Sequence, residues 1–238
     1  MNIAITGASK GVGYAVALYF AKEKHHKIFA ISRSVEGLEK LRKEGGEGII
    51  SLRCDITRDQ EIAEAVEEIG DRVNGIDILI NNAGLLINKP FSQLSMADWR
   101  AIYEVNVFGV FGMTKALLPK LGEGDLSHGG AIRSHIVNIA SAGGVQGSAK
   151  YKGLSAYSSS KGALIAMSEC LAEEVSSMGI VSNSIALGSV ETEMFRLAFP
   201  GLKASVSTER IARWIGQFAE SGYEFFNGKT LVASTNNP

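Results

Sequence analysis

Tyr157 and Lys161 are the two residues of this sequence whose types and spacing point most directly to chemistry. In a helix, side chains four positions apart lie on one face, one turn from each other. A tyrosine hydroxyl has an ordinary pKa near ~10 and is a poor proton donor or acceptor at neutral pH. A neighbouring ammonium favours the phenolate and lowers that pKa, so the pair is a candidate general acid and base. The same spacing also fits an exposed lysine beside a half-buried tyrosine, and the rest of the chain must decide.

The elements that would position this pair alternate between strand and helix. Short apolar runs bounded by glycine or polar residues predict buried parallel strands at 3–6, 27–31, 48–52, 76–80, 136–140, 180–187 and 228–232. Helical patterns separate them, among them 14–21, 95–120, 157–178 and 208–218. The alternation predicts an α/β fold with one doubly wound, Rossmann-like parallel sheet of about seven strands and helices on both faces. Residues 1–238 are expected to form a single cofactor-binding and catalytic domain.

Two helix starts are predicted from capping residues. Thr57 with Gln60 and Ser95 with Asp98 both place a hydroxyl three residues before a polar partner. The second helix contains Asn106 inside an apolar stretch. A buried asparagine is costly unless it is hydrogen-bonded, so Asn106 is either a core residue bonded to backbone or part of a site.

A glycine-rich turn follows the first strand. Gly7, Gly11 and Gly13 lie between that strand and the first helix, with the spacing Gly-x3-Gly-x-Gly. Such a turn lets the backbone approach a phosphate while the helix N-terminus faces the negative charge. A plain tight turn is the alternative interpretation.

Two cations lie where a nucleotide ribose would meet a doubly wound sheet. The second strand ends at Ser32 and Arg33, and Lys10 is in the glycine turn. An acidic residue at this place binds a free ribose hydroxyl, whereas an arginine donates hydrogen bonds to the oxygens of a 2′-phosphate. The two cations therefore predict a site for a ribose 2′-phosphate, as in NADP(H), and two solvated surface cations are the alternative interpretation. Asp55, after the third strand, is either a contact for the adenine amino group or an ordinary turn aspartate.

The composition excludes several classes of protein. Apolar residues make up 45% and charged residues 21% of the 238 residues, and the net charge is −1, so no electrostatic footprint for nucleic acid or an anionic membrane is visible. The sequence has no uninterrupted apolar run of about 18 residues, the length that would predict a membrane span, and its first residues do not resemble a signal peptide. Cys54 and Cys170 form no metal or redox motif. We therefore expect a cytoplasmic protein without a metal site.

Taken together, several stretches resemble the short-chain dehydrogenase/reductase family, in its compact single-domain type. They occur in the family's order and cover essentially the whole chain. The matching residues are Thr6 to Gly13, Asn81-Asn82-Ala83-Gly84, Asn106, Ser141, Tyr157 with Lys161, and more weakly Gly188 to Thr192 and Asn227-Gly228-Lys229.

The resemblance implies an NAD(P)-dependent hydride transfer and a role for each matching residue. Tyr157 would donate a proton to a carbonyl oxygen that Ser141 polarises, Lys161 would lower the pKa of Tyr157 and bond the nicotinamide ribose, and Asn106 would hold a water linked to Lys161. The cofactor-binding residues would be Thr6, Gly7, Ser9, Lys10, Gly11, Val12, Gly13, Ser32, Arg33, Asp55, Ile56, Asn82, Ala83, Gly84, Tyr157, Lys161, Gly188, Val190 and Thr192.

Two functions of different classes follow. The first is an NADPH-dependent reductase of a small-molecule ketone or 3-oxoacyl thioester, and the second is a non-catalytic NADP(H)-binding sensor on the same fold. A sensor has no need of the complete set of Asn106, Ser141, Tyr157 and Lys161. The apolar helix 157–178 and the resemblance both predict a homodimer or homotetramer.

The substrate lid has two candidates. A short helix over 194–199 would offer Met194, Phe195, Leu197 and Phe199 as apolar cover before Pro200-Gly201 end it. The alternative lid is the long loop with Lys150-Tyr151-Lys152, whose lysines could also meet an acidic carrier protein. A lid as short as 194–199 cannot enclose a large ligand, so we expect an open cleft beside Ser141 and Tyr157 that accepts several carbonyl compounds with modest discrimination.

Overall fold

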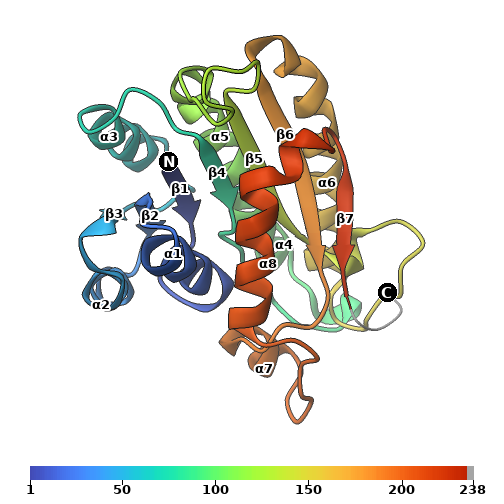
Figure 1. The fold of residues 1–238 in the computed structure, drawn as a ribbon. Coiled ribbons are helices and arrows are strands. Elements are labelled where there is room, and N and C mark those ends of the chain that lie inside the picture. The colour runs from blue at the N-terminus through green and yellow to red at the C-terminus, as the bar shows by residue number, and fades with distance from the viewer. Residues whose placement is uncertain (235–238) are drawn as a thin grey trace.

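The computed structural model describes residues 1–234 and contains one seven-stranded sheet (Figure 1). The last four residues of the predicted domain, 235–238, lie outside the described residues. The strands are β1 (Asn2–Thr6), β2 (Lys27–Ser32), β3 (Ile49–Arg53), β4 (Ile78–Asn81), β5 (Ser134–Ser141), β6 (Ile180–Leu187) and β7 (Thr230–Ala233). They are all parallel, in the order β3-β2-β1-β4-β5-β6-β7. The predicted α/β doubly wound fold is confirmed.

Helices cover both faces of this sheet. One layer contains α1 (Gly11–Glu23), α2 (Val35–Gly45) and α8 (Thr208–Ser221), and the other contains α3 (Asp59–Gly70), α5 (Gly109–Gly122) and α6 (Ser155–Glu174) (Figure 1). The strands bury residues toward both layers, which is why they read as continuous apolar runs. All eight residues of β6 are buried, for example. Two apolar cores result, one on each face.

The order of the strands places the site. The chain adds β2 and β3 on one side of β1 and then crosses over to add β4 on the other side, so a crevice opens between β1 and β4 at their carboxyl ends. The same edge of the sheet collects the ends of β5 and β6 at Ser141 and Leu187. The short helix α7 (Glu193–Ala198) lies beyond this edge, at the bottom of Figure 1.

One predicted helix cap is wrong. Helix α3 begins at Asp59, and its N-cap residue Arg58 makes no side-chain cap. The Thr57 hydroxyl instead donates to the Asp55 carboxylate, with 2.8 Å between Thr57 Oγ1 and Asp55 Oδ1. Gln60 donates forward to Glu64 rather than back to the cap. A strand-end carboxylate thus outcompetes the helix for the threonine hydroxyl.

The long helix predicted over 95–120 begins as expected but is interrupted. The capping box of Ser95 and Asp98 is confirmed at the start of α4 (Met96–Tyr103). Residues Glu104–Phe108 then form a π-helical segment before α5 continues. Such segments are single-turn widenings that occur frequently at functional sites. This one contains Asn106.

The continuous helical run Met96–Gly122 has 27 residues, and an 18-residue stretch of it has a mean hydropathy of 1.2, which is long and apolar enough to cross a membrane by length and composition. Core helices of soluble proteins meet the same criterion. Here one side of the run packs into the domain, where Ile102, Val110, Met113 and Leu117 have no exposed surface.

Candidate active site

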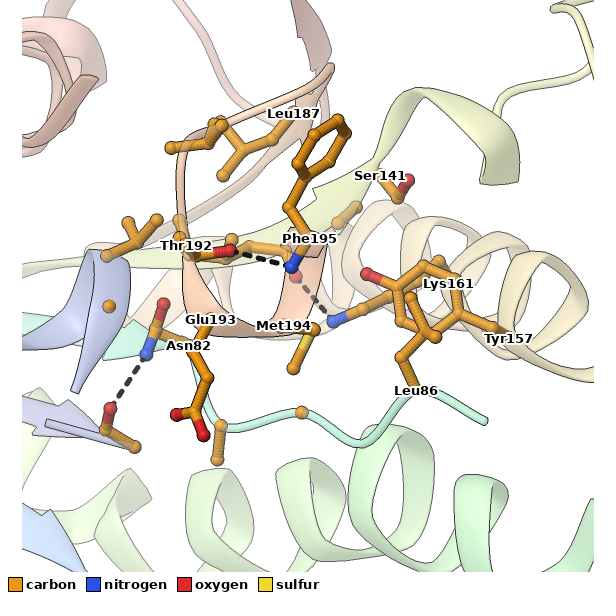
Figure 2. Close-up of a pocket in the computed structure, with 18 of the residues that line it drawn as sticks. Asn82, Leu86, Ser141, Tyr157, Lys161, Leu187, Thr192, Glu193, Met194 and Phe195 are labelled. Carbon is orange, nitrogen blue, oxygen red and sulfur yellow. Dashed lines mark hydrogen bonds between the residues drawn. The ribbon is translucent and has the colours of Figure 1, made fainter. Parts of the chain in front are cut away.

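Ser141, Tyr157 and Lys161 meet at the carboxyl edge of the sheet, as the sequence predicts (Figure 2). Ser141 is the last residue of β5, and Tyr157 and Lys161 lie one turn apart in α6. The Lys161 side chain is only 3% exposed and donates to the carbonyl of Ile139, with 2.7 Å between Nζ and O. Its Nζ lies 6.0 Å from the centre of the Tyr157 ring. The hydroxyl and the ammonium therefore face one small space.

Burial sets the protonation of both groups. It raises the pKa of Tyr157 to about 12, against the opposing effect of the hydrogen bond with Ser141, and it lowers the pKa of Lys161 to about 8. For Tyr157 the cost of a buried phenolate outweighs the opposing contact with Ser141. The predicted lowering of the Tyr157 pKa by Lys161 stays a prediction. At neutral pH, Tyr157 keeps its proton, which is the state that a proton donor needs.

Asn106 braces the catalytic helix. Its Oδ1 accepts from the backbone N–H of Leu85 at 2.7 Å, and its Nδ2 donates to the carbonyl of Leu85 and to Ser160 Oγ at 2.9 Å. Ser160 Oγ in turn donates to the carbonyl of Tyr157 at 2.7 Å. Asn106 thus ties the chain after β4 to the turn of α6 that carries Tyr157. Its predicted water contact toward Lys161 stays a prediction.

The glycine turn has the shape that a phosphate cradle requires. Gly7 and Gly11 have φ values of +66° and +61°, which L-residues with a side chain rarely adopt. A Cβ at Gly13 would lie 2.6 Å from the carbonyl oxygen of Gly7. The N-cap residue Lys10 makes no side-chain cap, and the first turn of α1 contains no acidic residue. Because the first N–H groups of a helix have no intrahelical partner and the N-cap side chain does not bond them here, the turn fits a dinucleotide phosphate.

The end of β4 is clamped to this turn. Asn82 Nδ2 donates to the carbonyls of Thr6 and Gly7 at 3.0 and 3.1 Å. Thr6 Oγ1 accepts from the backbone N–H groups of Asn82 and Ala83. At the next position, a Cβ on Gly84 would lie 3.6 Å from Lys161 Nζ. The Asn82-Ala83-Gly84 turn therefore joins the glycine turn to Lys161.

The predicted adenosine end contains two ion pairs. Arg33 Nη1 lies 3.6 Å from Asp55 Oδ2, and Lys10 Nζ lies 2.8 Å from Glu193 Oε2. Burial opposes ionisation of Asp55, but hydrogen bonds from Thr57 and the Arg33 cation hold the pKa of that carboxyl below its ordinary value. The Lys10–Glu193 pair, which joins the glycine turn to α7, is absent from the sequence-based expectations.

One cavity of about 540 Å³ joins these groups, and most of the predicted site residues line it. The lining members of the predicted set are Gly7, Ser9, Lys10, Gly11, Val12, Ser32, Arg33, Asp55, Ile56, Asn82, Ala83, Gly84, Ser141, Tyr157, Lys161, Gly188, Val190 and Thr192. Thr6, Gly13 and Asn106 stand behind its wall and hold it through the contacts given above.

Some residues at the cavity are not predicted by the sequence analysis. Leu86 and Leu154 border the cavity next to the catalytic groups, and Ser160 supports them from behind. Leu86 follows the Asn-Asn-Ala-Gly turn directly, so its position in the chain is a usable signal. Thr192 Oγ1 accepts from the backbone N–H of Phe195 at 3.1 Å and so caps α7 over the cavity (Figure 2). Within residues 1–234, no group of three or more His, Cys, Asp or Glu side chains could hold a metal ion.

A doubly wound sheet with a glycine cradle and a serine, tyrosine and lysine at its carboxyl edge defines a nicotinamide-dependent oxidoreductase class. Residues 1–202 match the family described as short chain dehydrogenase. The chain belongs to the short-chain dehydrogenase/reductase family, and it is an oxidoreductase of that family.

Its relatives are reductases. The chain is 29% identical over 190 residues to a 3-oxoacyl-acyl-carrier-protein reductase of Vibrio cholerae, covering 80% of this chain and 73% of the relative. It is 33% identical over 194 residues to the reductase of the same name from Thermotoga maritima, covering 80% and 74%.

Two solved structures share the fold over nearly the whole chain. One is a 3-ketoacyl-acyl-carrier-protein reductase of Brucella melitensis complexed with NADH, with a TM-score of 0.85, 25% identity and coverage of 98% and 96%. The other is an actinorhodin polyketide ketoreductase with NADPH, with a TM-score of 0.84, 27% identity and coverage of 98% and 95%.

Proposed function

We propose that the protein reduces the carbonyl group of a ketone or a 3-oxoacyl thioester to an alcohol, with NADPH as the hydride donor. The observation that carries this proposal is the meeting of Ser141, Tyr157 and Lys161 in one cavity that continues into the glycine cradle. Relatives named as 3-oxoacyl-acyl-carrier-protein reductases and a polyketide ketoreductase support the same reaction class.

Ser141, Tyr157 and Lys161 each have a separate role in the proposed reaction. NADPH bound along the cradle supplies the hydride. Ser141 Oγ and the Tyr157 hydroxyl both donate hydrogen bonds to the carbonyl oxygen, and Tyr157 transfers its proton to that oxygen as negative charge develops. Because the pKa of Tyr157 is about 12, its hydroxyl is protonated before the reaction. The Lys161 ammonium then stabilises the resulting phenolate until a proton returns.

Lys10 and Arg33 support NADP(H) as the cofactor, and Ser32 lies between Arg33 and the glycine turn. Ser32 Oγ donates to Ser9 Oγ at 2.8 Å, which holds the end of β2 against that turn. Both cations are exposed and line the cavity, and an arginine fork can donate to two phosphate oxygens at once. The related structures contain NADH in one case and NADPH in the other, so the choice depends on these two side chains.

We also propose that the substrate is a free small molecule and that the protein works as a cytoplasmic homodimer or homotetramer. The thiols of Cys54 and Cys170 are unpaired, as a reducing compartment requires. Lys150 donates to the carbonyl of Val145 and to Ser148 Oγ, both at 2.6 Å. Because this ammonium folds onto its own loop, it offers little to an acidic carrier protein.

A spectrophotometric assay tests the proposal. NADPH oxidation is followed with a panel of ketones and 3-oxoacyl thioesters, using the wild-type protein and Tyr157→Phe. The variant keeps the ring and removes the proton donor, so we expect unchanged NADPH binding and a turnover lower by roughly 10²–10⁴-fold. Tight NADPH binding without turnover of any carbonyl would identify the protein as a non-catalytic sensor. Near wild-type turnover in Tyr157→Phe would remove the acid role from Tyr157.

A further inference from the structure

Two segments that are distant in the chain meet over the substrate end of the cavity. Tyr151, from the loop before α6, packs its ring on Phe199, just after α7, with 5.9 Å between ring centres and planes at 71°. Phe199 packs on Phe195 of α7, with 5.2 Å between ring centres. All three rings line the cavity. The two lids that the sequence offers as alternatives are therefore one aromatic wall.

A third segment braces this wall. Asn88, from the chain after β4, donates through Nδ2 to the carbonyl of Ala198 at the end of α7, at 2.6 Å. The neighbouring Lys89 N–H donates to the carbonyl of Gly153 in the loop, at 3.1 Å. Asn88 and Lys89 thus bond to both halves of the wall, and these bonds fix the spacing of the rings.

The inner surface of the cavity beside the reacting groups is apolar. In Figure 2 the side chains of Leu86, Met194 and Phe195 surround the approach to Tyr157. Tyr151 is 58% exposed at the mouth, although its ring is large and largely apolar. The ring of Tyr151 is thus accessible to a ligand at the mouth of the cavity.

The charged side chains that line the cavity are paired, buried or at its outer rim. Among the described residues that line the cavity, six are charged. Lys10 pairs with Glu193, Arg33 pairs with Asp55, and Lys161 is buried against Ile139, which leaves Lys203 exposed at the rim. A single solvated lysine does not make the bidentate site that a carboxylate prefers.

We propose that the aromatic wall of Tyr151, Phe195 and Phe199 binds the group attached to the carbonyl, and that this group is an uncharged, flat apolar ring. The inference rests on the proposed reductase function and names its substrate class, an aryl ketone. Rings in edge-to-face and offset contacts attract each other beyond the area that they bury. The wall selects a flat ring over a saturated ring of similar size for this reason.

Three ketones test the proposal. Acetophenone and cyclohexyl methyl ketone share the acetyl group and differ in the ring, and para-acetylbenzoate adds a carboxylate to the first. Phe199→Leu and Tyr151→Leu keep apolar cover but remove a ring. We expect each variant to lower kcat/KM for acetophenone by about two- to tenfold, which corresponds to one aromatic pair, and to leave cyclohexyl methyl ketone nearly unchanged. In this comparison of variant with wild type, acetophenone and cyclohexyl methyl ketone are each compared with themselves, so their intrinsic reactivities cancel.

Phe225→Leu is the matched control, since Phe225 is 77% exposed and does not line the cavity. It should change neither ketone. Equal losses for both ketones, or no loss in either variant, would overturn ring recognition by the wall. Wild-type turnover of para-acetylbenzoate at least equal to that of acetophenone would overturn the uncharged class. If the wild-type protein reduces no carbonyl at all, the proposed function fails, which is a separate result from these.

Discussion

Replacing Arg33, Lys10 and Glu193 one at a time should separate the two cofactors by unequal and predictable amounts. A charge-assisted hydrogen bond is worth roughly 1.5–3 kcal/mol. Arg33 is 68% exposed, and its contact with Asp55 is long at 3.6 Å, so the lower end of that range applies and the Arg33 fork is free to turn to a phosphate. Arg33→Ala should therefore weaken NADPH binding by about tenfold and leave NADH almost unchanged.

Lys10 should contribute less than Arg33. Its ammonium already pairs with Glu193 at 2.8 Å, and it must leave that carboxylate to meet a 2′-phosphate. Ion pairs between exposed side chains typically change an equilibrium by no more than about fivefold. Lys10→Ala should then weaken NADPH by only about twofold to fivefold. Glu193→Gln should tighten NADPH by about two- to fivefold, because it frees Lys10, and should leave NADH unchanged.

Dissociation constants from isothermal titration calorimetry at low salt measure these effects, since high salt screens exposed charges. Glu23→Gln is the control, because it removes an exposed ion pair with Arg213 of 3.0 Å that lies outside the cavity. It should change neither constant. An equal loss for NADPH and NADH in Arg33→Ala would refute the 2′-phosphate assignment. Weaker NADPH binding in Glu193→Gln would refute the competition between Glu193 and the phosphate for Lys10.

Three further predictions follow from the structure. Because burial lowers the pKa of Lys161 to about 8, its ammonium is present below that pH and lost above it, so kcat/KM for NADPH should fall as pH rises through about 8. A flat profile to pH ~9.5 would remove this role from Lys161. Phe108 and Phe111, 56% and 53% exposed in the segments Glu104–Phe108 and α5, should lie in a subunit interface, and sedimentation should show Phe111→Glu as a smaller species than the wild type. His135 is buried and neutral, with its pKa lowered to about 4, so the unfolded chain binds more protons than the folded protein below pH ~6.5. The melting temperature should therefore drop from pH 7 to pH 5, and it should drop by less in His135→Asn.

The strand and helix order, and the edge of the sheet at which the site lies, follow from local patterns. Apolar runs that stop at Thr6, Asn81 and Ser141 are short-range signals, and parallel strands bring their carboxyl ends to one edge. The four-residue spacing of Tyr157 and Lys161 places both side chains on one helix face for the same local reason. The confirmed family membership gives this spacing its context.

Features that depend on competition between partners required the tertiary structure. Thr57 could cap a helix or bond Asp55, and only the packed strand end selects the second. The pKa of Tyr157 is raised by burial of its hydroxyl, and the four-residue spacing to Lys161 does not reveal that burial.

The same holds for contacts between distant segments. Lys10 meets Glu193 across 183 positions of the chain, and Tyr151 meets Phe199 through a wall built from two loops. No periodicity in the sequence encodes such a meeting, because it depends on how the loops beyond the sheet edge pack together. Local patterns in the sequence thus predict the fold and the candidate reacting residues, whereas the packing of distant segments sets the burial of those residues and the surface that faces the cavity.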